Sequence, residues 1–314
     1  MKRYFLPVFL GCAVFSASAP VFAGAGNFSF AVIAHAFTKT SDESVLRDAI
    51  AKTDADNLAF VVANGIKSNT EPCTDQIYSR RKALLDEAQN GLILSLAASD
   101  WADCRRNDGR SAAVERLNRL RELFFVDEFS LGKTRLPLIR QSLMPKFRSY
   151  GENARWAIND VMFATVNLPA NNNRYLSAAG RNSEFEDRLV ANRAWLEQLF
   201  NAATQKNLKA IVIFSDGNPF SKPDSTSLFG QRNRDGFAEV RRHINFFGSK
   251  FSGKVLVIHE QPTADPSPAT HISWRKNVGD LAIGSGWTKL TVTPSSREFF
   301  AVTHYPFTPH APER

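Results

Sequence analysis

Polar residues that follow apolar runs are the part of this sequence best suited to chemistry. They are His35 after the run 31–34, Asn64 after 58–63, Asp100 shortly after 92–96, and His259 after 255–258. In open α/β sheets, ligands bind beyond the carboxyl ends of the strands, so these side chains stand where a site would form. Imidazole and carboxylate groups hold divalent and trivalent metal ions, which makes a metal centre the first chemistry to consider.

Four longer motifs contain these residues: Ala31–His35 (AVIAH), Val61–Ser68 (VVANGIKS), Leu96–Cys104 (LAASDWADC) and Val255–Pro262 (VLVIHEQP). In order and spacing they resemble the calcineurin-like metallophosphoesterases, specifically an exported bacterial branch. There the corresponding motifs run roughly GDTPY, GDIKSG, GDNEWTDC and HGDSH. The likeness extends from about Phe28 to Pro306. It implies an α/β fold of the calcineurin-like phosphoesterase type, a two-sheet α/β sandwich with helices on the outer faces, and two metal ions at the strand ends.

Most of the residues that would hold those metals are replaced in this chain. The metal-binding Asp of the first motif corresponds to His35, and the bridging Asp of the second corresponds to Gly65. Ser99 replaces the metal-binding Asn of the third motif, although Asp100 keeps a carboxylate one position later. The fourth motif keeps His259 and lacks its second histidine. Because a carboxylate normally bridges the two ions, we expect the binuclear site to be lost and no cofactor to be bound.

Two functions follow from this comparison. The leading hypothesis is a pseudoenzyme that binds an unidentified ligand or protein partner through the former cleft or its rim. The alternative is a metal-dependent phosphoesterase that hydrolyses phosphomonoesters or phosphodiesters. Its reduced site would use His35, Asp100 and His259 with manganese, iron or zinc.

Several polar residues are candidates for the same cleft: His35, Asn64, Asp100, Asn167, Asn171, Asn172, Asp216 and His259. They could form a mononuclear metal site, or an anion pocket built from Asn side chains and loop N–H groups. Asn and Asp are also common turn and capping residues at strand ends, and we favour this simpler explanation. The loop 171–173 matches a polar loop of the resembled branch, so it is the part expected to retain a binding role.

The first 23 residues have the pattern of a cleaved export signal. Lys2 and Arg3 precede an apolar stretch over 4–15, and Val21–Ala23 fits a cleavage site. We therefore expect a single domain over residues 24–314, with a flexible tail over 306–314, located in the periplasm or secreted. A lipoprotein modified at Cys12 is disfavoured, because Phe9 stands where a small aliphatic residue is expected. No other apolar stretch is long enough to form a transmembrane segment.

Two cysteines remain after the signal, Cys73 and Cys104. In an oxidising compartment an isolated pair predicts a disulfide, and the resembled branch has cysteines at both positions. A zinc site is the alternative. The chain carries 39 basic and 31 acidic residues, a formal charge of +8. Because the basic residues are scattered and not interleaved with aromatic ones, no nucleic-acid partner is indicated.

Apolar runs alternate with amphipathic helical patterns along the chain. Helices are expected over 43–52, 75–89, 112–125, 184–204 and 237–247, and strands over 28–34, 58–63, 92–96, 154–158, 161–167, 210–214 and 255–258. Two further segments, 281–293 and 298–304, alternate as antiparallel strands do. In the helix over 112–125, Val114, Leu117, Leu120 and Phe124 form the predicted apolar stripe.

Overall fold

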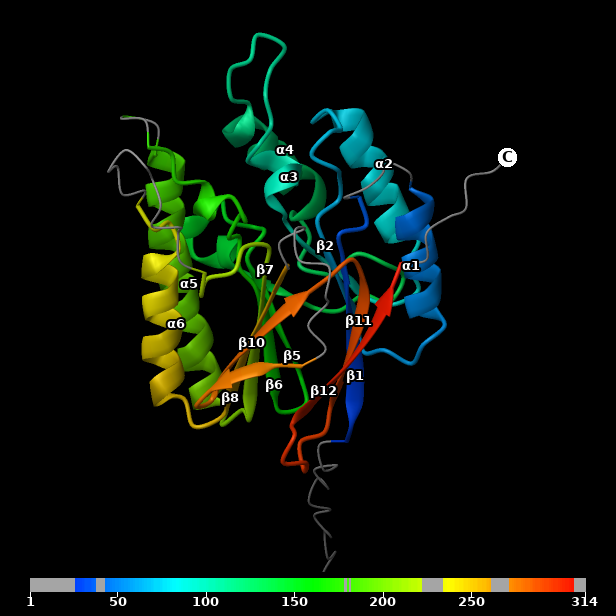
Figure 1. The fold of residues 1–314 in the computed structure, drawn as a ribbon, viewed down its shortest axis with the longest axis vertical. Coiled ribbons are helices and arrows are strands. Elements are labelled where there is room, and N and C mark those ends of the chain that lie inside the picture. The colour runs from blue at the N-terminus through cyan, green and yellow to red at the C-terminus, as the bar shows by residue number, and fades with distance from the viewer. Residues whose placement is uncertain are drawn as a thin grey trace, which may run out of the picture.

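The computed structural model describes residues 26–37, 43–177, 180, 182–221, 234–260 and 271–307. Within these ranges two β-sheets pack face to face, and helices cover both outer faces (Figure 1). The predicted two-sheet α/β sandwich is thereby confirmed. The export signal and the residues beyond 307 lie outside the described ranges, whereas Pro306, placed in the predicted tail, ends a strand.

The first sheet has five strands in the order β12-β11-β1-β2-β3. Their bounds are β1 Phe28–Ala34, β2 Val61–Asn64, β3 Leu92–Ser95, β11 Gly286–Val292 and β12 Phe300–Pro306. β1, β2 and β3 run parallel, and β11 and β12 extend the sheet in antiparallel fashion. The helices α1 (Ser44–Asp54), α2 (Asp75–Asp86) and α4 (Ala113–Phe124) contribute to the core on its outer face. The parallel strands are apolar and buried on both faces, as a covered parallel sheet requires.

The second sheet has seven strands in the order β4-β5-β6-β7-β8-β10-β9. Their bounds are β4 Ile139–Arg140, β5 Ala154–Ile158, β6 Val161–Thr165, β7 Ala210–Ser215, β8 Lys254–Glu260, β9 Ser273–Arg275 and β10 Val278–Ile283. The helices α5 (Ser183–Gln205) and α6 (Ala238–Lys250) cover its outer face (Figure 1). Short elements complete the fold: α3 Ala98–Trp101, and the 3₁₀ turns η1 Gln141–Leu143, η2 Pro145–Phe147 and η3 Asn172–Arg174.

Two sequence predictions need correction. The segment 281–293 was expected to form antiparallel strand, which holds for β11, but its first residues belong to β10, which runs parallel to β8 and antiparallel only to β9. Alternation of side chains does not encode strand direction, so the sequence pattern was silent on this point. Val114 is 47% exposed, because α4 instead turns Ala113 toward the core together with Leu117, Leu120 and Phe124. No described helix is both long and apolar enough to cross a membrane.

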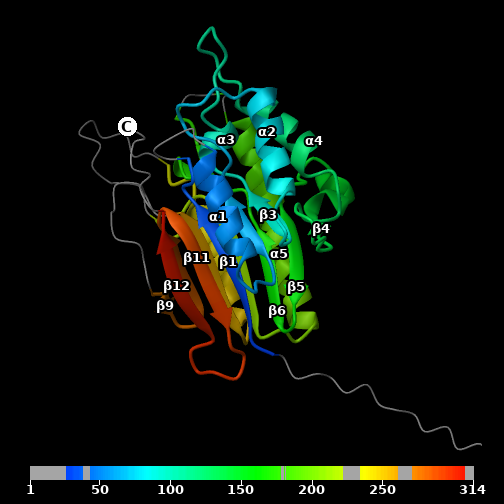
Figure 2. The same ribbon diagram turned by 90° about the vertical axis from the view of Figure 1, so that its right-hand side faces the viewer.

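An aromatic cluster joins the two sheets. Phe30 of β1 and Phe60 just before β2 come from the side of the five-stranded sheet, and Phe163, Phe214 and Trp156 come from the other sheet. Figure 2 shows the two sheets from the side, with β1 and β11 in one and β5 and β6 in the other. The rings of Phe60 and Phe163 lie 4.7 Å apart, edge to face, and those of Phe30 and Phe60 are stacked at 5.1 Å. Aromatic pairs in these geometries add to the stabilisation from burial alone. This layer packs the two sheets against each other.

Replacing Phe60 by Ala should lower the free energy of unfolding by about 3–5 kcal/mol, because Phe60 is fully buried against three aromatic rings. Urea denaturation followed by tryptophan fluorescence measures the change. Phe129→Ala is the control, because that ring is 42% exposed and its loss should cost less than about 1 kcal/mol. Equal losses in the two variants would contradict the assignment of the aromatic cluster as the joint between the sheets.

Candidate functional site

Three acidic side chains gather where the strand ends of the two sheets meet. Asp100 lies in α3 just beyond β3, Asp216 follows β7, and Glu260 ends β8. Asp100 and Asp216 are 0% and 2% exposed, and the side chain of Glu260 is 14% exposed. Burial raises the pKa of each carboxyl, and the charge of Glu260 raises that of Asp216 further, to well above its usual range. These three residues, the strand-end acids, form the chemical centre of this edge.

Both carboxylate oxygens of Asp100 accept hydrogen bonds from the backbone of the surrounding loops. Its Oδ1 accepts a hydrogen bond from the backbone N–H of Ile66 at 2.9 Å, and its Oδ2 accepts one from Ala97 at 2.8 Å. Burial raises the pKa of Asp100 to about 6, although these hydrogen bonds and the nearby Lys67 ammonium oppose the rise. Asp100 thus ties the start of α3 to the segment after β2, which is the capping role that its type favours at such positions.

Asp216 also accepts hydrogen bonds from loop backbone, and it does so from loops of both sheets. Its Oδ2 accepts hydrogen bonds from the backbone N–H groups of Ala98 and Ala170, each at 2.7 Å. Ala98 follows a strand of the five-stranded sheet, and Ala170 follows β6 of the seven-stranded sheet. One carboxylate oxygen therefore joins loops from both sheets. Asp216 and the preceding Ser215 are both buried.

Glu260 is a functional candidate that the sequence reasoning missed. His35, in the left-handed region with φ 56°, places its Nδ1 3.4 Å from Oε2 of Glu260. Burial raises the pKa of Glu260 to about 7, while hydrogen bonding between the side chains of Glu260 and Asp216 works against the rise. A signal for Glu260 existed in the sequence. In β8, Leu256 and Ile258 face the core between the sheets, so the next inward position is 260.

His259 lies on the other face of β8. Its neighbours on that face, Val255 and Val257, belong to the core beneath α5 and α6. His259 is 1% exposed, its Nδ1 lies 2.8 Å from the backbone O of Glu260, and its Nε2 lies 2.7 Å from Oδ1 of Asp280. Alternation along the strand thus separates His259 from His35 and Asp100, so the structure does not bring these three predicted ligands together.

Asn64 and Lys67 complete the edge. The Asn64 side chain is 6% exposed and lies beside Glu260, where its amide works against the rise in the pKa of that carboxyl. The ammonium group of Lys67 is buried and donates to the backbone O atoms of Ser68 at 2.7 Å and Ser99 at 2.8 Å. Burial lowers the pKa of Lys67, and the charges of Asp100 and two further acids oppose this. A side-chain cation therefore lies beside the strand-end acids.

The predicted asparagine loop is anchored to neighbouring segments. Asn171 donates to Oδ1 of Asp103 at 2.7 Å, and Asn172 donates to the backbone O of Arg234 at 3.0 Å and accepts from the N–H of Gly236 at 2.9 Å. Three successive residues of this loop, the η3 turn, have φ of 52°, 53° and 54°. Left-handed backbone is costly for residues other than glycine, so the side-chain anchors must hold this turn in place.

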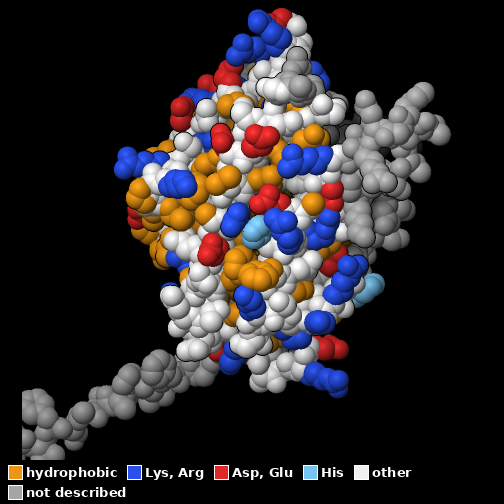
Figure 3. Space-filling model, turned by 90° about the vertical axis from the view of Figure 1, so that its left-hand side faces the viewer, with side chains coloured by type: hydrophobic (Ala, Val, Ile, Leu, Met, Phe, Trp, Pro, Cys, Tyr) orange, Lys and Arg blue, Asp and Glu red, His pale blue; other side chains and the backbone are white. Residues whose placement is uncertain are grey.

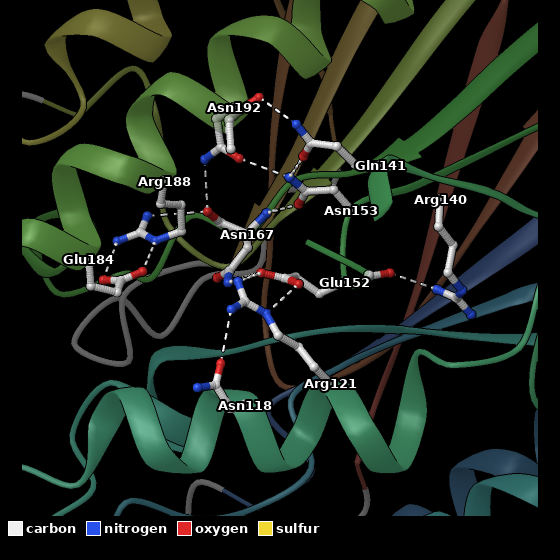
Figure 4. A network of polar contacts seen from close by, with 12 residues as sticks. Asn118, Arg121, Arg140, Gln141, Glu152, Asn153, Asn167, Glu184, Arg188 and Asn192 are labelled. Atoms are coloured by element: carbon white, nitrogen blue, oxygen red, sulfur yellow. Dashed lines mark hydrogen bonds and ion pairs between the residues drawn. The ribbon is translucent and has the colours of Figure 1, made fainter. Parts of the chain in front are cut away.

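Asn167 belongs to a second polar network, which is drawn in Figure 4. Its amide donates to Glu152 at 3.1 Å, and Glu152 also accepts two hydrogen bonds from Arg121 at 2.9 and 2.6 Å. Asn192 of α5 donates to the backbone O of Asn167 at 3.0 Å and accepts from Asn153 at 2.9 Å. This network joins α4, the end of β6 and α5, which indicates a role in the framework.

Cys73 and Cys104 form a disulfide, as the sequence predicts, with their Cα atoms 5.9 Å apart. It connects the segment before α2 to the segment after α3. Tyr78 of α2 donates to the backbone O of Asp100 at 2.7 Å beside it. The part of the chain that carries Asp100 is thus held by a covalent bond and a buried hydrogen bond.

The structure brings four of the predicted cleft residues to one edge: His35, Asn64, Asp100 and Asp216. Asn171 lies at its margin, and Asn172 and His259 make other contacts. Across the described ranges, no three His, Cys, Asp or Glu side chains are arranged so that they could hold a metal ion.

Comparisons with known proteins give one point of reference. No protein-family model matches the chain, and no curated protein sequence matches it. Among solved structures it is similar to a novel phosphatase from Mycoplasma pneumoniae, with 8% identity and a TM-score of 0.43 over 89% of this chain and 92% of that chain. At this level the similarity carries no argument about function, and the fold class rests on the two sheets themselves.

Stability should fall as the pH rises from about 5 to about 8, because the folded chain keeps protons that the unfolded chain has lost. The pKa of Glu260 rises from its ordinary value of 4.5 to about 7, so its stabilising contribution is complete below 4.5 and is lost as the pH passes 7. Glu260→Gln, which is neutral at every pH, should make the decline smaller by about 2 kcal/mol.

Urea denaturation at several pH values measures this slope. Glu298→Gln, which changes an exposed glutamate between β11 and β12, is the control and should leave the slope unchanged. A Glu260→Gln protein with the same slope as the wild type would show that Glu260 does not hold a proton in the folded state.

Proposed function

We propose that this protein has the calcineurin-like phosphoesterase fold without its binuclear metal chemistry, and that it acts by binding a ligand or partner at the strand-end edge. The observation that carries the proposal is that backbone N–H groups donate hydrogen bonds to the carboxylate oxygens. Both oxygens of Asp100 and one oxygen of Asp216 accept hydrogen bonds from four loop N–H groups. Oxygens used in this way are not directed at a common metal position.

The remaining residues also fit a binuclear centre poorly. Gly65 stands where the resemblance puts the bridging carboxylate, and its φ of 75° is unfavourable for any side chain. A Cβ atom at Gly65 would lie only 2.9 Å from Cβ of Ala97, so the loops leave no room for one. Asn64 beside it is neutral and cannot offset the charge of two cations. We derive no reaction step through metal ions at this edge.

The Lys67 ammonium supports the same proposal. It is 4% exposed and fixed by two backbone carbonyls beside Asp100. A buried positive charge beside Asp100 repels divalent cations, because charges in a buried site are weakly screened from one another. The polar groups of this edge therefore satisfy one another. In the proposed function, a partner would contact the rim around them.

Export to the periplasm is part of the proposal. The disulfide between Cys73 and Cys104 supports it, because such bonds persist in oxidising compartments and are rare in the cytosol.

One observation favours the alternative, a phosphoesterase with a reduced metal site. His35 lies 3.4 Å from Glu260, and Asp216 lies beside that glutamate. An imidazole and a carboxylate are both ligands of manganese, iron or zinc. In this alternative His35 and Glu260 would hold the ion, since His259 faces the other side of β8 and the described residues contain no ready group of three ligands.

Metal content separates the two functions. The purified chain is incubated with manganese, iron or zinc, freed of unbound ions and analysed by mass spectrometry, and its melting temperature is recorded with and without metal. We expect essentially no bound metal, no stabilisation and only background hydrolysis of aryl phosphate monoesters and diesters. About two ions per chain would overturn the proposal.

About one ion per chain, with hydrolysis that collapses in both His35→Ala and Glu260→Gln, would establish the alternative instead. His243→Ala is the control, because His243 lies on α6 in the outer helical layer and should leave any such activity unchanged.

A further inference from the structure

We propose that a hollow between α5 and α6 binds a small carboxylate that carries an aromatic ring. The hollow has a volume of about 350 Å³ and is lined by Arg193 and Glu197 of α5 and by Arg242, His243, Phe246 and Phe247 of α6. That volume lies in the range of small-molecule sites. Figure 3 shows this side of the molecule, with basic side chains around a histidine and beside a hydrophobic patch.

The hollow is separate from the strand-end acids. α5 and α6 pack on the outer face of the seven-stranded sheet, whereas Glu260 continues the inward face of β8. A ligand bound between the helices would thus have the sheet between itself and Glu260. The inference does not depend on the function proposed for the edge.

Two phenylalanine rings shape the apolar part of the hollow. Phe246 is 50% exposed, and its ring stands nearly perpendicular to that of Phe247, at 5.2 Å and 73°. Phe247 is held in place by stacking on Phe200 at 5.6 Å. The half-exposed Phe246 ring therefore offers an apolar surface, backed by Phe247, against which the flat ring of a ligand can pack.

Cationic groups surround this corner. Arg193 makes no ion pair with any other described residue, and the contact of Arg242 with Glu239 is long, at 3.9 Å. The Lys250 ammonium lies 3.9 Å from the centre of the Phe246 ring. A guanidinium group binds a carboxylate through two parallel hydrogen bonds, so Arg193 and Arg242 are suited to the charged end of the ligand.

His243 and Glu197 refine the choice of ligand. Nδ1 of His243 lies 2.8 Å from the backbone O of Glu239, so this nitrogen carries the proton, and Nε2 has no partner among the described residues. Glu197 adds a negative charge to the same wall. Because that charge repels multiply charged anions more strongly, the hollow favours a monoanionic carboxylate over a phosphate dianion.

Isothermal titration calorimetry with benzoate tests the proposal on the purified mature chain. We expect one saturable site, and binding at least about tenfold weaker for acetate, which lacks the ring, and for benzyl alcohol, which lacks the charge. Arg193→Gln, Arg242→Gln and Phe246→Ala should each weaken benzoate binding by about threefold to tenfold, and Glu197→Gln should tighten it.

Two exposed residues elsewhere serve as matched controls. Arg148→Gln and Leu143→Ala should leave the affinity for benzoate unchanged. Unchanged melting temperatures in all variants would show that the fold is intact. The proposal is overturned if benzoate shows no saturable binding, if acetate binds as tightly, or if the hollow variants behave like the controls.

Discussion

One buried carboxylate holds the two halves of this molecule together at the edge where a site would form. Asp216 accepts the backbone N–H groups of Ala98 and Ala170, which follow strands of different sheets. Burying a carboxylate is costly, and hydrogen bonds from N–H groups offset that cost. The placement of Asp100, Glu260 and His35 depends on this contact, because it fixes the loops that carry or face them.

At this edge of the sheets, polar side chains are hydrogen-bonded to the backbone of the surrounding loops. In α/β proteins the carboxyl ends of strands are where ligands bind, because loops converge there and backbone N–H groups are exposed. Here the N–H groups of the loops are bound by Asp100 and Asp216 instead of a ligand, and Lys67 supplies the cation. Raised pKa values of the acids follow from the same closure, since water is excluded from them.

Two further sets of contacts hold the elements around this edge in place. The aromatic cluster between the sheets sets their separation, and the network around Glu152 and Asn167 fixes α4 and α5 against the end of β6 (Figure 4). Almost every polar group in that network meets a partner, as buried polar groups must. The hollow between α5 and α6 differs, because Arg193 makes no ion pair with any other described residue and the contact of Arg242 with Glu239 is long, at 3.9 Å.

Most of the fold could be predicted from the sequence alone. The long elements α5 and β1 match their predicted ranges closely, and the two-sheet class follows from strands that alternate with helices. The short strands β4 and β9 were missed, because two or three residues carry no periodic signal. The sequence also determined which side chains are available as metal ligands. Gly65 has no side chain and Asn64 is neutral, so neither can bridge two cations. The tertiary structure decided that Glu260, and not His259, faces the edge. It also decided that backbone N–H groups donate hydrogen bonds to Asp100 and Asp216. The reason is physical: the direction in which a strand residue faces depends on which side packs against the second sheet, and three of these four hydrogen bonds join residues more than 30 positions apart.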